Sequence, residues 1–193
     1  AACVWDDEDI YPQHCNCASS EPCSMMQQQW AALELMLAQG RTRAIGVSNF
    51  CAPCLDCLAK VSTTVPAVNQ LQFHAGMPGA DPEGLVGASQ ARGIVAQAYS
   101  PLAGEQAGAL LGDPAMKAIG AAHNISSAQV ALRWVLQLGV ALTTATASED
   151  HMVDDVSAWT PGAQGQLTDA EMAQITALSV APAAPVKAMC LFP

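Results

Sequence analysis

From residue 30 to about residue 178, short apolar runs alternate with segments whose apolar residues recur every three or four positions. The short runs are typical of buried strands, and the periodic segments are typical of helices. The predicted strands cover 43–48, 67–73, 94–99 and 140–144. The predicted helices cover 30–40 and 51–60, and four more begin at Asp81, Asp113, Ser126 and Thr168. This alternation predicts parallel βαβ units, about four of them.

The starts of the later helices carry local signals. Asp81 and Asp113 each precede a proline, which is the pattern of an N-cap followed by proline at the first helical position. Ser126 with Gln129, and Thr168 with Glu171, have the spacing of capping boxes.

Both ends of the chain differ from this core. Residues 1–29 combine an acidic run at 6–9 with four of the eight cysteines and little apolar period, so we expect an irregular arm. Residues 181–193 are rich in proline and alanine and are expected to form an extended tail. The predicted folded domain therefore covers residues 30–180.

Composition narrows the class of protein. Hydrophobic residues make up 51% of the chain but aromatic residues only 5%, so the core must be built from small side chains, which suits an α/β fold. The formal net charge of −10 leaves no basic face for nucleic acid or anionic membranes. No apolar run reaches the roughly 20 residues of a transmembrane segment. The start shows no signal peptide and no Met, and we hypothesise a soluble, processed organellar protein of otherwise unknown location.

Four motifs stand at or near the predicted strands, in the order Gly46-Val-Ser-Asn-Phe50, Val68-Asn-Gln70 with Gln72 and His74, Ala98-Tyr-Ser-Pro-Leu102 and Ala128-Gln-Val-Ala-Leu-Arg-Trp134. Trp30, Leu33 and Glu34 precede them on the first predicted helix. Together they resemble the aldo-keto reductase family from its fourth helix onward, over about residues 30–178. The resemblance implies a partial (β/α)8 TIM-type barrel, roughly its C-terminal four βα units.

The resemblance also implies a nicotinamide site at the carboxyl ends of the strands, where such barrels place their active sites. Ser48, Asn49 and Gln70 would hydrogen-bond the carboxamide, and Tyr99 would stack on the ring. By the same resemblance, Ser100 and Leu102 are also expected at coenzyme-binding positions. Taken without the family, Ser48 and Asn49 could cap the following helix, Gln70 could satisfy buried backbone groups, and Tyr99 could be core.

The family's catalytic tetrad of Asp, Tyr, Lys and His is absent from the predicted barrel strands. By resemblance, the first three residues come from the N-terminal half of the barrel. The histidine would lie in an Ile-His-Trp-Pro-like segment, and the nearest match is Ile10-Tyr11-Pro12-Gln13-His14, where His14 is offset. Tyr11 lies beside an acidic run that would raise its pKa, so we assign no catalytic residue.

The segment expected to bind the adenosine 2′-phosphate of NADPH has lost its cations. Residues 142–155 contain no Lys or Arg. By resemblance, Thr144 stands in place of the lysine, and Asp150 or His151 in place of the arginine. A phosphate there would meet acidic side chains and lose its charge-assisted partners. We therefore expect no bound cofactor, or NADPH or NADH if the ancestral site is retained.

The spacing of Cys51, Cys54 and Cys57 resembles an iron–sulfur ligand run, which makes these residues weak metal candidates. They fall on a predicted helix, so buried structural cysteines are the alternative. His14, Cys15, Cys17 and Cys23 match no standard zinc site, and a local disulfide or free thiols are expected there.

A half barrel leaves strand edges and an apolar inner face uncovered. We therefore expect other protein chains to cover it, and our first hypothesis is a non-enzymatic accessory subunit of a larger assembly. The alternative is an NAD(P)H-dependent reductase of aldehydes or ketones whose N-terminal catalytic half is missing from this chain. A redox or metal-binding protein that uses the cysteines is a third hypothesis.

Overall fold

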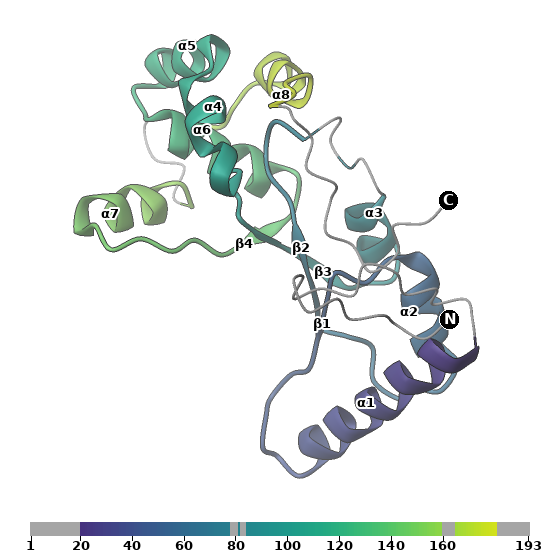
Figure 1. The fold of residues 1–193 in the computed structure, drawn as a ribbon. Helices are drawn as coiled ribbons and strands as arrows, with labels where there is room; N and C mark the ends of the chain where they lie inside the picture. The colour runs from purple at the N-terminus through teal and green to yellow at the C-terminus, as the bar shows by residue number, and fades with distance from the viewer. Residues whose placement is uncertain (1–19, 78–80, 82–83, 160–164, 181–193) are drawn as a thin grey trace. The chain divides into compact units, whose positions relative to one another are not determined.

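The computed structural model describes residues 20–77, 81, 84–159 and 165–180. These residues belong to two compact units. The first holds residues 20–71 and 84–96, and the second holds residues 72–77, 81, 97–159 and 165–180. The elements labelled in Figure 1 are α1 (Ser20–Ala38), β1 (Val47–Ser48), α2 (Ala52–Ala59), β2 (Val68–Gln72), α3 (Leu85–Gln90), β3 (Val95–Tyr99), α4 (Ala107–Gly112), α5 (Pro114–His123), α6 (Ser127–Gln137), β4 (Ala141–Leu142), α7 (Glu149–Ser157) and α8 (Asp169–Thr176). A short 3-10 helix, η1 (Gly104–Gln106), precedes α4.

In the first unit, β1 and β2 run parallel, with Val47 opposite Asn69 and Ser48 opposite Gln70. The amide of Val95 donates to the carbonyl oxygen of Ala67 at 3.2 Å, so the chain entering β3 runs beside the chain entering β2. Parallel strands joined by helices are the arrangement that the alternating apolar pattern predicts.

The core of the first unit lies where the helices meet these strands. Trp30 of α1, Leu58 of α2 and Ile45 before β1 are buried together. Val47 and Phe50 pack against this cluster, so the chain on either side of Ser48 and Asn49 is held by apolar contacts.

The helix α1 begins at Ser20, so the expectation of irregular structure was wrong for residues 20–29. Cys23, Met26 and Trp30 are all buried and lie three or four residues apart. Cysteine and methionine therefore supply the helical period in a stretch that otherwise looks polar. The rest of the expected arm, and the tail 181–193, lie outside the described residues.

In the second unit, β3 and β4 run parallel, with Gln97 opposite Ala141 and Ala98 opposite Leu142. The helix α6 is buried along most of its length, and its Trp134 stacks on Phe73 with ring centroids 5.4 Å apart. The indole of Trp134 donates to Thr176 of α8 at 3.1 Å. These contacts place α6 at the centre of this unit.

The predicted capping boxes are present at Ser126 with Gln129 and at Thr168 with Glu171, and Asp113 caps α5. The start predicted at Asp81 was wrong. The helix α3 begins at Leu85, after Gly84 at a φ of 64°. No described helix is both long and apolar enough to cross a membrane.

Candidate functional site

Ser48, Asn49 and Gln70 meet where β1 and β2 end. Ser48 lies directly opposite Gln70 in the parallel register. The Ser48 hydroxyl donates to the Gln70 carbonyl oxygen at 3.1 Å, and the Asn49 amide donates to the same oxygen at 2.8 Å. The structure thus brings together the three residues that the resemblance assigns to one end of the coenzyme.

Of these three residues, Asn49 has the features most typical of a ligand-binding residue. Its backbone is left-handed, with a φ of 58°, a conformation that asparagine tolerates better than most residues. The residue is 6% exposed, and its side-chain Oδ1 is buried with no hydrogen-bond partner among the described residues. A buried acceptor without a donor costs roughly 1–3 kcal/mol, so an incoming N–H group would relieve that cost.

The alternative role as a helix cap does not apply to this turn. The N-cap of α2 is Cys51, and the helix start has no side-chain cap hydrogen bond. Ser48 and Asn49 therefore stand before the helix without capping it.

Asn69 supports this turn, and the sequence analysis assigned it no role. It is fully buried, and its Nδ2 donates to the Phe50 carbonyl oxygen at 2.7 Å while its Oδ1 accepts from the Phe50 amide at 3.2 Å. The same Nδ2 donates to Ser89 Oγ at 3.0 Å. The available signal was a polar residue at a buried position of an alternating strand.

In the second unit, Tyr99, Ser100 and Leu102 line a cavity of about 610 Å³. The other lining residues are Pro101, Gly104, Ala107, Leu111, Ser126, Ala128, Thr143, Thr144, Ala145, Thr146, His151, Asp154 and Asp155. This volume is in the range of small-molecule sites. The structure therefore places the second set of predicted residues in the lining of one cavity.

The turn after β3 has unusual backbone geometry. Ser100 and Ala103 adopt left-handed conformations, with φ values of 52° and 68°. Such a conformation costs a residue other than glycine roughly 1–2 kcal/mol, and Ala103 has no polar group to offset this. The Ala103 amide donates to the Ser100 carbonyl oxygen at 2.9 Å, closing a tight turn around Pro101 and Leu102. Strained turns of this kind often mark ligand sites.

The lining of this cavity also includes residues 143–146 after β4 and part of α7. Threonines, His151, Asp154 and Asp155 belong to this part of the lining. No Lys or Arg lines the cavity within the described part of the chain. Sequence analysis found the same lack of cations here.

In the first unit, the buried Oδ1 of Asn49 is an acceptor that suits an N–H group such as that of a carboxamide. In the second unit, the lining of the cavity does not suit the 2′-phosphate of NADPH. A 2′-phosphate requires cationic partners, and Asp154 and Asp155 are anionic.

The cysteine spacing does not mark a metal site, which corrects that expectation. Cys51, Cys54 and Cys57 are all in disulfide bonds, so they offer no thiolate to a metal ion. Within the described ranges, no group of three or more His, Cys, Asp and Glu side chains could hold a metal. Burial of these cysteines is confirmed. His14, Tyr11, Cys15 and Cys17 lie outside the described residues.

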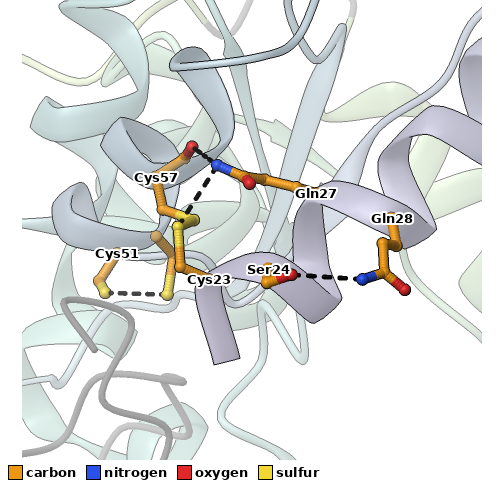
Figure 2. Close-up of a disulfide and its surroundings, with 7 residues drawn as sticks. Cys23, Ser24, Gln27, Gln28, Cys51 and Cys57 are labelled. Atoms are coloured by element: carbon orange, nitrogen blue, oxygen red, sulfur yellow. Dashed lines mark hydrogen bonds between the residues drawn. A yellow bond between two sulfur atoms is a disulfide. The ribbon is translucent and has the colours of Figure 1, made fainter. Parts of the chain in front are cut away.

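One of these disulfides joins Cys57 of α2 to Cys23 of α1, 34 residues apart in sequence (Figure 2). The Gln27 side chain donates to the Cys57 carbonyl oxygen at 2.9 Å beside this bond. A link of this length corrects the expectation of a local disulfide or free thiol at Cys23.

Comparison with known proteins is consistent with this geometry. Over 161 residues the chain is 37% identical to morphine 6-dehydrogenase of Pseudomonas putida, covering 78% of this chain and 52% of that enzyme. It is 35% identical over 150 residues to glyoxal reductase of Bacillus subtilis, covering 78% and 51%. The chain thus spans about half the length of the curated relatives that it matches.

Solved structures of aldo-keto reductases have a similar fold over most of this chain. An aldose reductase from Schistosoma japonicum superimposes with a TM-score of 0.70 at 26% identity, over 80% of this chain and 47% of that one. An aldo-keto reductase described as complexed with NADPH gives a TM-score of 0.67 at 28% identity, over 78% and 46%.

The family model described as the Aldo/keto reductase family matches residues 4–180, which confirms the resemblance inferred from the four motifs. With its parallel α/β fold and its oxidoreductase relatives, this chain belongs to the aldo/keto reductase family.

Proposed function

We propose that this chain supplies the coenzyme-binding part of a nicotinamide-dependent carbonyl reductase. The observation that carries the proposal is the buried, unpartnered Oδ1 of Asn49 in its left-handed turn. An acceptor held in this way is prepared for the N–H group of a ligand. The names of the relatives favour this hypothesis over the accessory subunit that we expected first, which no observation supports.

Each residue in the site has a distinct part in holding the coenzyme. The Asn49 side chain accepts a hydrogen bond from the carboxamide. The Ser48 hydroxyl already donates to the Gln70 backbone, so its oxygen remains as an acceptor. By family resemblance, the Gln70 amide would contact the same carboxamide. By the same resemblance, Tyr99 in the second unit would stack on the nicotinamide ring. The reduced nicotinamide, when bound, supplies the hydride that a carbonyl carbon takes up.

The proton donor for that reaction lies outside this set. We propose that the chain forms roughly the C-terminal four βα units of the barrel, as the half-length match to relatives suggests. The remaining strands, with the family's tyrosine and lysine, would come from the other half of the barrel or from another chain. This chain would then orient the coenzyme, and its partner half would protonate the carbonyl oxygen.

The substrate class follows from chemistry shared by the relatives. One is named for glyoxal, an aldehyde, and another for the dehydrogenation of morphine, an alcohol. Both names describe interconversion of a carbonyl and an alcohol, so we propose small aldehydes or ketones as substrates.

The test is coenzyme oxidation by protein purified from its natural source together with any associated chains. Absorbance of NADH or NADPH at 340 nm is followed with glyoxal and with an aromatic ketone. We expect turnover that requires both the carbonyl compound and the protein. If the protein binds coenzyme but oxidises none with any carbonyl compound, the reductase proposal fails and the accessory hypothesis regains support.

A further inference from the structure

The lining of the 610 Å³ cavity includes a wall formed by residues 143–146 and part of α7, the segment where, by resemblance, the family places its 2′-phosphate site. Thr144, which by resemblance stands in place of the expected lysine, lines this wall, and so does His151. The same wall carries Asp154 and Asp155 of α7. The loss of cations seen in the sequence is therefore a property of the cavity surface itself.

The backbone of α7 at Asp154 is held by α6. Gln129 of α6 is buried, and its Nε2 donates to the Asp154 carbonyl oxygen at 3.3 Å and to Ser157 Oγ at 2.5 Å. Ser157 Oγ in turn donates to the Asp154 carbonyl oxygen at 2.7 Å. Gln129 Oε1 accepts from the Ser126 amide at 2.8 Å, and Ser126 also lines the cavity. The acidic wall is thus anchored to the centre of its unit.

The burial of Asp155 should strengthen the electrostatic repulsion between this wall and a bound anion. Asp154 is exposed, whereas Asp155 is 9% exposed. A partly desolvated carboxylate repels a nearby negative charge more strongly than one in bulk water. A phosphate monoester carries nearly two negative charges at neutral pH. A carboxylate, by contrast, accepts hydrogen bonds from the hydroxyls of an unmodified ribose.

We propose that this cavity selects a dinucleotide with a free ribose 2′-hydroxyl, NADH, and rejects the 2′-phosphorylated NADPH. Asp154 and Asp155 are the specificity-determining residues, and Thr144 removes the cation that would otherwise offset them. This inference rests on the proposed function, because it assumes that the cavity binds a nicotinamide dinucleotide.

The experiment compares ADP with adenosine 2′,5′-bisphosphate on the full 193-residue chain by isothermal titration calorimetry. These probes differ in where their second phosphate lies, and the second carries the 2′-phosphate of NADPH. NADH and NADPH are titrated in parallel. We expect NADH to bind about tenfold or more tightly than NADPH, and ADP more tightly than adenosine 2′,5′-bisphosphate, because the 2′-phosphate adds negative charge in a cavity lined by two aspartates.

Three variants test the residues assigned. Asp154→Asn with Asp155→Asn removes both charges, and Thr144→Lys adds a cation; both should reduce the discrimination to about threefold or less. Asp169→Asn is the matched control, because Asp169 is an exposed carboxylate of the same unit, on α8, and does not line the cavity. It should leave the ratio within about twofold of wild type, since an exposed charge farther away is screened.

Each remaining outcome overturns the inference. If 2′-phosphorylated nucleotides bind as tightly as the others, the inference is wrong while the proposed function stands. If the double variant shifts the ratio no more than Asp169→Asn, the assignment of Asp154 and Asp155 is wrong. If none of the four nucleotides binds, the proposed function fails and the inference fails with it.

Discussion

The side chain of Asn69 makes two hydrogen bonds to the backbone of Phe50: it donates to the carbonyl oxygen at 2.7 Å and accepts from the amide at 3.2 Å. A side-chain amide thus takes the place of a neighbouring strand just after β1 ends. The residue held in this way directly follows Asn49, so the buried acceptor of the candidate site depends on an amide 20 residues away in sequence.

Replacing Asn69 by leucine should destabilise the first unit. The change keeps the number of side-chain heavy atoms but leaves the Phe50 amide and carbonyl without their partners, which should cost about 2–4 kcal/mol. Urea unfolding followed by circular dichroism measures this loss. Gln28→Leu is the control, because Gln28 is an exposed amide that bonds only to Ser24 among the described residues, and it should cost less than about 0.5 kcal/mol. Equal losses in the two variants would contradict the role given to Asn69.

Replacing Asn49 by glycine separates the role of its backbone from that of its side chain. Glycine adopts the left-handed turn without strain, so stability should change by less than about 1 kcal/mol. The amide is lost, and NADH affinity should fall about tenfold, the value of one buried hydrogen bond. Titration calorimetry measures affinity, and urea unfolding measures stability.

Asn49→Ala completes that comparison. It also removes the amide but should be less stable than the glycine variant by about 1 kcal/mol, because alanine is strained at a φ of 58°. If Asn49→Gly binds NADH as well as wild type, the side chain does not hold the coenzyme.

The disulfide between Cys23 and Cys57 should contribute strongly to stability. It closes a loop across 34 residues and joins α1 to α2, so the double variant Cys23→Ser, Cys57→Ser should lose about 3–4 kcal/mol. Peptide mass spectrometry under non-reducing conditions should find the two cysteines cross-linked. A mass showing either cysteine as a free thiol would contradict the pairing, as would unchanged unfolding of the double variant.

Acid should weaken the first unit through Glu34. Burial alone would raise the pKa of Glu34, but hydrogen bonds from Thr64, Thr63 and Trp30 to its carboxylate outweigh this and lower the pKa below its usual 4.5. A carboxylate with a lowered pKa stabilises the fold above pH 4.5, and this stabilisation is lost as the pH falls through the folded-state value.

The measurement is the urea midpoint between pH 7 and pH 3. Glu34→Gln should have a lower midpoint than wild type at pH 7, and the two should converge toward pH 3. Glu105→Gln, at an exposed carboxylate, is the control and should follow the wild-type curve. A gap between wild type and Glu34→Gln that stays constant with pH would argue against the assigned hydrogen bonds.

Much of the fold could be predicted because the signals were local. Ser126 with Gln129 and Thr168 with Glu171 carry their capping partners within three residues, and both boxes are present. The start of α3 was mispredicted because Asp81 and Pro82 form an attractive local signal, yet the helix begins only after Gly84. The local capping preference of Asp81 and Pro82 therefore did not determine where this helix begins.

The candidate site was predictable only in part, because some of its contacts join residues that are distant in sequence. Ser48, Asn49 and Gln70 could be identified from strand ends and family motifs, and the structure places them together. The support from Asn69 and the disulfide partner of Cys57 depend on contacts that are distant in sequence. Disulfide connectivity in particular cannot be deduced from cysteine spacing.

Hydrogen–deuterium exchange with and without NADH tests most directly whether this chain binds a nicotinamide coenzyme. We expect NADH to slow amide exchange in peptides that cover residues 48–50, 99–104 and 143–146. Slowing at all three places would mean that the strand-end turn and the cavity walls both bind the coenzyme. Unchanged exchange at saturating NADH, or slowing confined to a segment such as α8, would contradict the account.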